Sequence, residues 1–266
     1  MVIITLLTDY GPGTEHVGAL HAVLAARCPD ADRIDLAHDL PPGDVRMGAV
    51  VLARLVPLAP VGVHVAVVDP GVGTARRGVA VALTDGRYLV GPDNGVLHAT
   101  CAAIGVSAAV ELVSPAHRRE PIAPTFHGRD VFAPAAAHLA EGGALDDLGP
   151  RVDPASLARA DLPSPRVGAG RLDATVLGVD RFGNVQLLAG AGDLAAAGLG
   201  LGDEIRLGDG DRSVALRIGR VFADVPAGAL VTYVDAHGHV AVAVNGGSAT
   251  ARLGIHAGVR ITLRRA

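Results

Sequence analysis

Residues 66–78 read Ala-Val-Val-Asp-Pro-Gly-Val-Gly-Thr-Ala-Arg-Arg-Gly. The apolar run 63–68 has the length and composition of a short buried strand. It ends at Asp69, where a proline and two glycines favour a turn. A carboxylate at a strand end, followed by glycines and then Arg76 and Arg77, is typical of a ligand site in a parallel α/β sheet. A plain glycine turn with a capping aspartate and solvated arginines would explain the same residues.

Strand-like and helix-like segments alternate on both sides of this stretch. Strands separated by amphipathic helices predict a largely parallel sheet with helices on both faces. An apolar periodicity of three and four residues predicts a first helix between Thr14 and Pro29. The other expected helices are 47–55, 96–104 and 129–139, and the expected strands are 2–7, 33–36, 63–68, 78–84, 87–90 and 108–113.

The second half of the chain has a different pattern. Prolines and glycines in 149–172 indicate a linker, which we place at 161–172, between an α/β domain over 1–160 and a second domain over 173–266. Short β-like runs then follow one another with no longer helix than the alanine-rich 191–198. This pattern predicts a smaller, all-β domain of barrel type.

Composition excludes several classes of function. The chain has 266 residues, half of them hydrophobic, and a net charge of −4, so no basic surface for nucleic acid is expected. No run reaches the roughly 18 apolar residues of a membrane span. Residues 1–7 lack the features of a signal peptide, and we therefore expect a cytoplasmic protein. Its two cysteines, Cys28 and Cys101, are expected to be free thiols.

Polar side chains follow several predicted strands at the point where each strand ends. Asp9, His38, Asp69 and Asp93 all stand in such positions, and His127 precedes a predicted helix. Carboxyl ends of parallel strands meet at one edge of a sheet, so these side chains are expected to converge there.

Each of these residues also has a purely structural interpretation. Asp9 could cap its turn, His38 could be a core histidine, Asp93 could belong to an Asn-Gly turn, and His127 could cap a helix. The histidines and carboxylates lack metal-ligand spacing, and no Gly-x-Ser-x-Gly elbow is present. We therefore expect no metal and no cofactor.

Five motifs stand in the order found in one known family, across nearly the whole chain. With these motifs the chain resembles the S-adenosyl-L-methionine (SAM) hydroxide adenosyltransferases, or SAM hydrolases, which are relatives of the fluorinase and chlorinase. The family's fold, an α/β domain followed by a β-barrel domain, agrees with the prediction above. The motifs are residues 6–11 (Leu-Leu-Thr-Asp-Tyr-Gly), 67–74 (Val-Val-Asp-Pro-Gly-Val-Gly-Thr), 91–95 (Gly-Pro-Asp-Asn-Gly), 125–130 (Thr-Phe-His-Gly-Arg-Asp) and 180–184 (Asp-Arg-Phe-Gly-Asn).

The resemblance implies that water attacks C5′ of SAM and releases adenosine and L-methionine. It assigns catalysis to Asp69, Arg76 and His127. Asp69 would orient the water, Arg76 would keep Asp69 ionised, and His127 would hold the water or take its proton. Halide-using relatives carry an aromatic residue in place of this aspartate, and the fluorinase has Tyr-Ser in place of the His-Gly pair, so this chain has the hydrolase form.

The resemblance also implies which residues bind the substrate. In the first domain, Asp9 would hold the ribose hydroxyls and Phe126 would lie near the sugar or the sulfonium. In the second domain the expected contacts are Asp180 and Asn184 to the amino-acid end, and Phe182, Asn245 and Gly246 to the adenine.

The chain departs from the family's pattern at Asp235-Ala236-His237, where relatives commonly carry a serine. Asp235 beside the substrate carboxylate would be unfavourable unless the methionine ammonium faces it. The family also implies a homotrimer with the site between subunits. The alternatives to a hydrolase are a SAM-dependent chlorinase and a SAM- or adenosine-binding sensor with little turnover.

Overall fold

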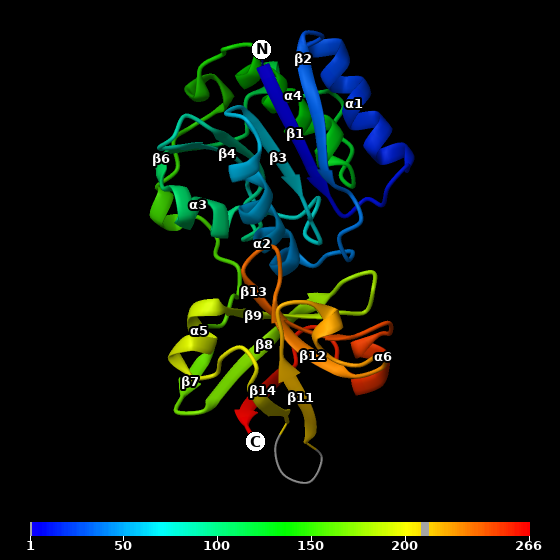
Figure 1. Cartoon of the computed structure of the whole chain (residues 1–266). Coiled ribbons are helices and arrows are strands. Elements are labelled where there is room, and N and C mark those ends of the chain that lie inside the picture. Colours follow the sequence, from blue (N-terminus) through cyan, green and yellow to red (C-terminus); the bar gives the residue numbers. More distant parts are fainter. Residues whose placement is uncertain (1, 209–212) are drawn as a thin grey trace. The chain divides into compact units, whose positions relative to one another are not determined.

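The computed structural model describes residues 2–208 and 213–266. Its chain divides into two compact units, Met1–Asp161 and Leu162–Ala266. The first combines a sheet with helices and the second is built mainly of strands (Figure 1). This arrangement confirms the predicted fold class. No helix among the described residues is long and apolar enough to cross a bilayer.

The first unit is built on a six-stranded sheet in the order β2-β1-β3-β5-β4-β6. The first four strands in this order, β2, β1, β3 and β5, are parallel to one another. β4 runs antiparallel to both of its neighbours, β5 and β6. The sheet is therefore largely parallel, as predicted. Its strands are β1 (Val2–Thr8), β2 (Ala31–Ala37), β3 (Val63–Val67), β4 (Gly78–Leu83), β5 (Tyr88–Pro92) and β6 (Val106–Glu111).

Helices cover both faces of this sheet, because successive side chains of its buried strands point to opposite sides. Ile4 and Leu6 of β1 belong to a core shared with α1 and α4. The opposite face is covered by α2 and α3, which pack against each other. The helices are α1 (Glu15–Arg27), α2 (Val45–Leu55), α3 (His98–Ile104) and α4 (Ala133–Ala140). The predicted helix 129–139 is divided between two elements. Gly128–Phe132 form a π-helical turn, and α4 follows it from Ala133.

The second unit closes into a seven-stranded barrel. Its ring runs β14-β10-β11-β12-β13-β9-β8, and the pairing of β8 with β14 closes it. A further strand, β7 (Arg166–Gly168), pairs with β8 outside the ring, so part of the segment 161–172 is strand. The ring strands are β8 (Arg171–Val179), β9 (Val185–Gly190), β10 (Glu204–Leu207), β11 (Val214–Ile218), β12 (Leu230–Val234), β13 (His239–Val244) and β14 (Arg260–Arg265).

Two short α-helices accompany the barrel within its described residues. α5 (Ala191–Ala196) lies within the predicted alanine-rich segment. α6 (Ala249–Leu253) was not predicted, since five residues are too few to show a helical period. Its N-terminus is capped by the hydroxyl of Ser248, which accepts a hydrogen bond from the amide of Ala251 at 3.2 Å.

One titratable side chain is fully enclosed in the sheet. His64 of β3 is 0% exposed, and its Nδ1 lies 2.9 Å from the hydroxyl of Thr5 on the neighbouring strand. Burial and the positive charge of Arg87 lower the pKa of His64 to about 4. The histidine is therefore neutral in the folded protein at pH 7.

This buried histidine predicts a loss of stability in acid. The unfolded chain binds a proton on His64 near pH 6.5 and the folded chain only near pH 4, so acidification between these values favours unfolding. Linkage gives a loss of about 2 kcal/mol from this residue between pH 7 and pH 5. Urea unfolding at the two pH values should show that His64→Asn removes a pH-dependent loss of this size. The exposed His256→Asn is the matched control, and an equal pH dependence in both variants would contradict the prediction.

Candidate active site

The carboxylate at the end of β3 is held by an arginine seven residues later. Nε of Arg76 donates to both oxygens of Asp69 at 3.0 Å, and Nη2 also donates to Oδ2. Both side chains are largely enclosed, at 5% exposure for Asp69 and 11% for Arg76. The guanidinium also lies 5.3 Å from the centre of the Phe132 ring. A bidentate fork of this kind fixes the plane of the carboxylate as well as its charge.

The same guanidinium reaches a histidine from a distant loop. Nη2 of Arg76 lies 2.8 Å from Nδ1 of His127. A guanidinium only donates, so Nδ1 accepts and the ring proton of the neutral imidazole stands on Nε2. Burial and the nearby charge of Arg76 lower the pKa of His127, which keeps the ring neutral. His127 occupies the N-cap position of the π-helical turn but makes no side-chain cap, which excludes its helix-capping interpretation.

The turn after Asp69 allows this loop to approach. Gly73 has a φ of +78°, and a side chain there would bring its Cβ within 2.5 Å of the carbonyl oxygen of Pro124. Only glycine combines that backbone conformation with so close a contact. The glycine turn thus serves the approach of the segment that carries His127.

A buried carboxylate anchors the other end of the segment. Asp130 is fully buried and accepts two hydrogen bonds of 2.7 Å from Arg129 and one of 2.8 Å from the amide of Ala123. Burial opposes its ionisation, but these donors outweigh burial and the pKa of Asp130 lies below its usual value. Asp130 therefore fixes the loop on both sides of His127.

A tyrosine packs on the glycine that follows the histidine. A Cβ on Gly128 would lie 2.3 Å from the hydroxyl oxygen of Tyr10. Burial and the carboxylates of Asp9 and Asp69 raise the pKa of Tyr10, so the phenol keeps its proton. Its ring makes an edge contact with Phe126 at 5.9 Å between centroids. The first two motifs and the fourth therefore meet around one tyrosine.

Asp9 leaves the sheet beside Asp69. Thr8 of β1 lies opposite Val67 of β3 in the parallel register, so the two carboxylates follow neighbouring strand ends. Oδ2 of Asp9 accepts a hydrogen bond of 2.7 Å from the amide of Gly43. This bond joins two loops, whereas the cap of its own turn would have needed a local contact.

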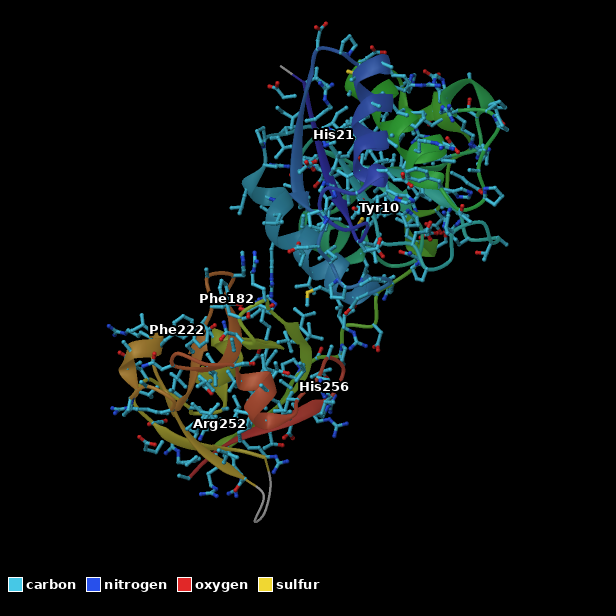
Figure 2. All side chains as sticks on the ribbon, turned by 90° about the vertical axis from the view of Figure 1, so that its right-hand side faces the viewer. Tyr10, His21, Phe182, Phe222, Arg252 and His256 are labelled. Carbon is cyan, nitrogen blue, oxygen red and sulfur yellow. The ribbon has the colours of Figure 1, made fainter. Side chains whose placement is uncertain are left out.

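The second unit contains a cavity of about 740 Å³. Its lining includes Phe182 and Phe222, both of which are labelled in Figure 2. Phe182 is 72% exposed, which is unusual for so large an apolar side chain. The lining residues include every site residue predicted for this unit. They are Asp180, Phe182, Asn184, Phe222, Tyr233, Asp235, Ala236, Val244, Asn245, Gly246, Gly247 and Ser248.

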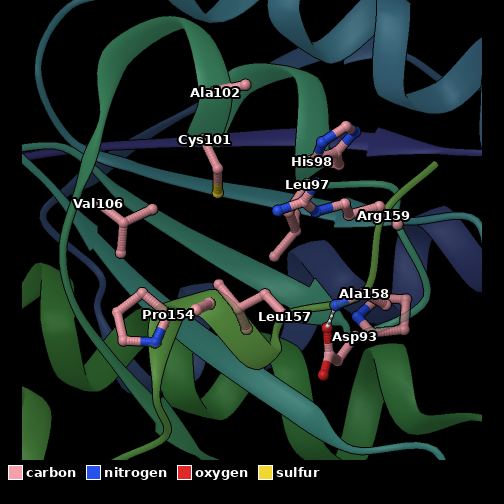
Figure 3. A pocket seen from close by; sticks show the side chains of 13 residues that line it. Asp93, Leu97, His98, Cys101, Ala102, Val106, Pro154, Leu157, Ala158 and Arg159 are labelled. Atoms are coloured by element: carbon pink, nitrogen blue, oxygen red, sulfur yellow. Dashed lines mark hydrogen bonds between the residues drawn. The ribbon is translucent and has the colours of Figure 1, made fainter. Parts of the chain in front are cut away.

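Two polar groups from the predicted sheet edge have structural roles instead. The hydroxyl of Thr8 lies 2.8 Å from Nδ1 of His38, which is buried. Arg77, expected to be solvated, forms an ion pair with Asp93 through bonds of 2.9 and 2.5 Å. Asp93 also accepts from the amide of Ala158 at 2.7 Å, at the rim of a small pocket beside α3 (Figure 3).

The cysteine in that pocket is not suited to act as a nucleophile. Cys101 lines it and is a free thiol, as is Cys28. Burial, with the charge of Asp93, raises the pKa of Cys101 to about 11, so the thiolate needed of a nucleophile is scarce at pH 7.

Within each unit, the structure thus places the predicted site residues close to one another. Asp69, Arg76 and His127 are in direct contact, and Asp9 and Phe126 adjoin them through Tyr10. Sequence reasoning missed Tyr10 and Asp130, although both stand inside the quoted motifs. Within the described ranges, no three His, Cys, Asp or Glu side chains are grouped as metal ligands.

Comparison with known proteins gives matches over most of the chain. Residues 4–149 match the SAM hydroxide adenosyltransferase N-terminal domain, and residues 174–262 match the C-terminal domain of the same name. A crystal structure of an uncharacterized conserved protein from Thermotoga maritima superposes with a TM-score of 0.91. That protein is 33% identical, and the match covers 98% of this chain and 100% of the other.

Named relatives fall into two groups. An (R)-S-adenosyl-L-methionine hydrolase of Salinispora tropica is 50% identical over 97% of this chain and 96% of the relative. A hydrolase of the same name from Thermus thermophilus is 42% identical over 97% of each chain. A fluorinase of Nocardia brasiliensis is 29% identical over 98% of this chain and 96% of the relative. The hydrolases are therefore the nearer group among these.

The contact between Tyr10 and Gly128 predicts a specific mutational coupling. Gly128→Ala places a methyl group against the phenol oxygen and should lower the free energy of unfolding by about 1–3 kcal/mol, the cost of overpacking. Tyr10→Phe removes that oxygen, so the double variant should recover part of the loss in urea unfolding.

Gly18→Ala provides the control, since Gly18 lies in α1 with open space around its Cβ position. It should be neutral or stabilising, because alanine favours helix more than glycine does. Strictly additive effects of Gly128→Ala and Tyr10→Phe would disprove the coupling.

Proposed function

The chain belongs to the SAM hydroxide adenosyltransferase family, and from this we propose that it hydrolyses SAM to adenosine and L-methionine. The observation that carries the proposal is the contact of Asp69 and His127 through one arginine, Arg76. Support also comes from relatives named SAM hydrolase at 50% and 42% identity. Asp69 and the His127-Gly128 pair have the hydrolase form of the two positions that distinguish the family's halide-using members.

In the proposed reaction, a water oxygen forms a bond to C5′ while the C5′–sulfur bond breaks. The electron pair of that bond goes to the sulfonium sulfur, which leaves as the neutral thioether of methionine. No acid is needed, because the leaving group carries no negative charge. The protein then has to orient the water and exclude competing solvent.

Asp69 and His127 offer the water one acceptor and one donor. Nε2–H of His127 would donate to the water oxygen, and Asp69 would accept one of its protons and turn a lone pair toward C5′. The surplus proton would leave through Asp69 to solvent. Nδ1 of His127 is occupied by Arg76 and Nε2 carries the ring proton. Of the two roles expected for His127, this favours holding the water over taking its proton.

Substrate contacts are proposed along the lines of the family. Asp9 would bind the ribose hydroxyls and Phe126 would lie near the sugar or sulfonium. In the second unit, Asp180 and Asn184 would bind the amino-acid end of SAM, while Phe182, Asn245 and Gly246 would contact the adenine. Support for the second group comes from their common position in the lining of one cavity.

The proposal extends to assembly, location and cofactors. We expect a homotrimer, a cytoplasmic enzyme, no nucleic-acid or membrane partner, and a reaction that needs neither metal nor cofactor. Light scattering on the purified protein tests the trimer, and an unchanged rate after treatment with EDTA tests the independence from metal.

Product analysis distinguishes the proposed reaction from its rivals. SAM is incubated with the purified protein in heavy-oxygen water, with and without chloride, and the nucleoside is analysed by mass spectrometry. Adenosine labelled at O5′ is the expected product. Formation of 5′-chloro-5′-deoxyadenosine would identify a chlorinase, and binding without any product would identify a sensor.

Removing either group that faces the water should lower turnover. Asp69→Asn and His127→Ala should each lower kcat by about 100-fold or more, the size typical of acid–base and positioning groups. Asp93→Asn is the matched control, because it also neutralises a largely enclosed aspartate that is paired with an arginine. Wild-type turnover in the first two variants would mean that the chemistry takes place elsewhere.

The protonation state of His127 sets the acid limit of the activity. Its pKa is lowered by burial and by Arg76, so the neutral ring should persist below pH 6.5 and kcat/KM should fall only at more acidic pH. Protonation on Nδ1 would displace the bond from Arg76. This acid limb should be absent from the residual activity of His127→Asn, and a limb centred above pH 6.5 would contradict the assignment.

A further inference from the structure

The cavity of the second unit has an unusual charge for a site that would receive a zwitterionic tail. Two carboxylates, Asp180 and Asp235, line it, and no lysine, arginine or histidine is among its described lining residues. The substrate tail of the proposed function carries an ammonium and a carboxylate. An ammonium would be attracted to such a lining, whereas a carboxylate would be repelled.

Both carboxylates are fixed in place and keep capacity for a further donor. Oδ1 of Asp180 accepts from the amides of Phe182 and Asn184, each at 2.9 Å, and Oδ1 of Asp235 accepts from those of His237 and His239, each at 2.9 Å. Oδ2 of Asp180 accepts from the side-chain amide of Asn184 at 2.8 Å, and Oδ2 of Asp235 accepts from the side-chain amide of Gln186 at 3.3 Å. A carboxylate oxygen can accept two hydrogen bonds, so each second oxygen can accept one more beyond those donated by the described residues.

A buried amide adds another acceptor. Asn184 is 6% exposed and lines the same cavity. Its Nδ2 donates to Asp180, which fixes the orientation of the amide and leaves Oδ1 with no protein donor within the described ranges. Asn184 lines the cavity, so this amide oxygen can accept a hydrogen bond from a ligand there.

Aromatic rings complete a lining suited to a cation. The chain has only three tyrosines and four phenylalanines, yet Phe182, Phe222 and Tyr233 all line this cavity. Phe222 and Tyr233 meet edge to face at 5.1 Å between centroids. Aromatic faces attract sulfonium and ammonium groups, and they also stack on a purine.

We propose that Asp235 makes this enzyme selective for sulfonium nucleosides whose aminoalkyl tail lacks the carboxylate. The preferred substrate class is then S-adenosyl sulfonium carrying a 3-aminopropyl group, the decarboxylated form of SAM. Asp180, Asp235 and Oδ1 of Asn184 receive the tail's ammonium. The reaction is unchanged: water bonds to C5′, and the sulfur leaves as a neutral thioether. This inference rests on the proposed function and specifies its substrate.

The test compares kcat/KM for SAM and for its decarboxylated form. We expect the wild-type protein to prefer the decarboxylated form by about 10-fold or more, as one additional charge contact at a partly exposed site allows. Asp235→Asn should reduce this preference by about 10-fold, mainly by improving the use of SAM. The variant keeps the fold, because Oδ1 of an asparagine accepts the same two amide bonds. Asp193→Asn, an equal charge change in α5 outside the cavity, should leave the ratio unchanged.

Binding measurements separate this inference from the proposed function. In an Asp69→Asn background, titration calorimetry gives Kd for both compounds, and Asp235→Asn should again reduce the preference. Equal effects of Asp235→Asn on both compounds, or a wild-type preference for SAM, would overturn the inference while leaving SAM hydrolysis intact. Tight, selective binding in this background, with no adenosine formed from either compound by the wild-type protein, would overturn the proposed function and support the cation-selective cavity.

Discussion

One guanidinium organises the candidate site. Arg76 donates to the carboxylate of Asp69 and to Nδ1 of His127. A single planar cation thereby fixes the plane of the carboxylate, the orientation of the imidazole and the position of the ring proton on Nε2. A lysine could balance the charge of Asp69, but it has no planar fork to serve both partners. The relation between carboxylate and imidazole therefore depends on this arginine.

The surrounding fold brings three distant segments to that guanidinium. The parallel pairing of β1 and β3 fixes where Asp69 leaves the sheet. Because Gly73 has no side chain, the loop that precedes His127 can approach it closely. Gly128 leaves room in the same way for the hydroxyl group of Tyr10. Asp130 then holds the loop by hydrogen bonds on both sides of the histidine. Small residues permit the approach and a buried carboxylate maintains it.

The sequence alone predicted the parts of this arrangement that depend on local pattern. The strand before Asp69, its glycine turn and the alternation of strands with helices follow from periodicity and turn chemistry. The packing of Tyr10 on Gly128 and the role of Asp130 could not be predicted, because both arise from contacts between loops with no periodic signal. The ion pair of Arg77 was missed for the same reason, since its partner Asp93 lies in the turn that follows β5. In the barrel, the site residues were predicted from the family resemblance, because the pattern of the strands does not distinguish binding residues from other residues.

The orientation of His127 also bears on why so few charged groups suffice for the proposed chemistry. An imidazole that accepts from an arginine and donates through Nε2 is poorly placed to remove a proton, so it serves a water molecule as a donor. A sulfonium leaves as a neutral thioether, so the reaction needs no acid, and the water's proton can depart after the C5′–oxygen bond has largely formed. Under the proposed function, catalysis then comes from alignment and exclusion of solvent. The rigid fork between Asp69 and Arg76 suits that task better than a mobile base would.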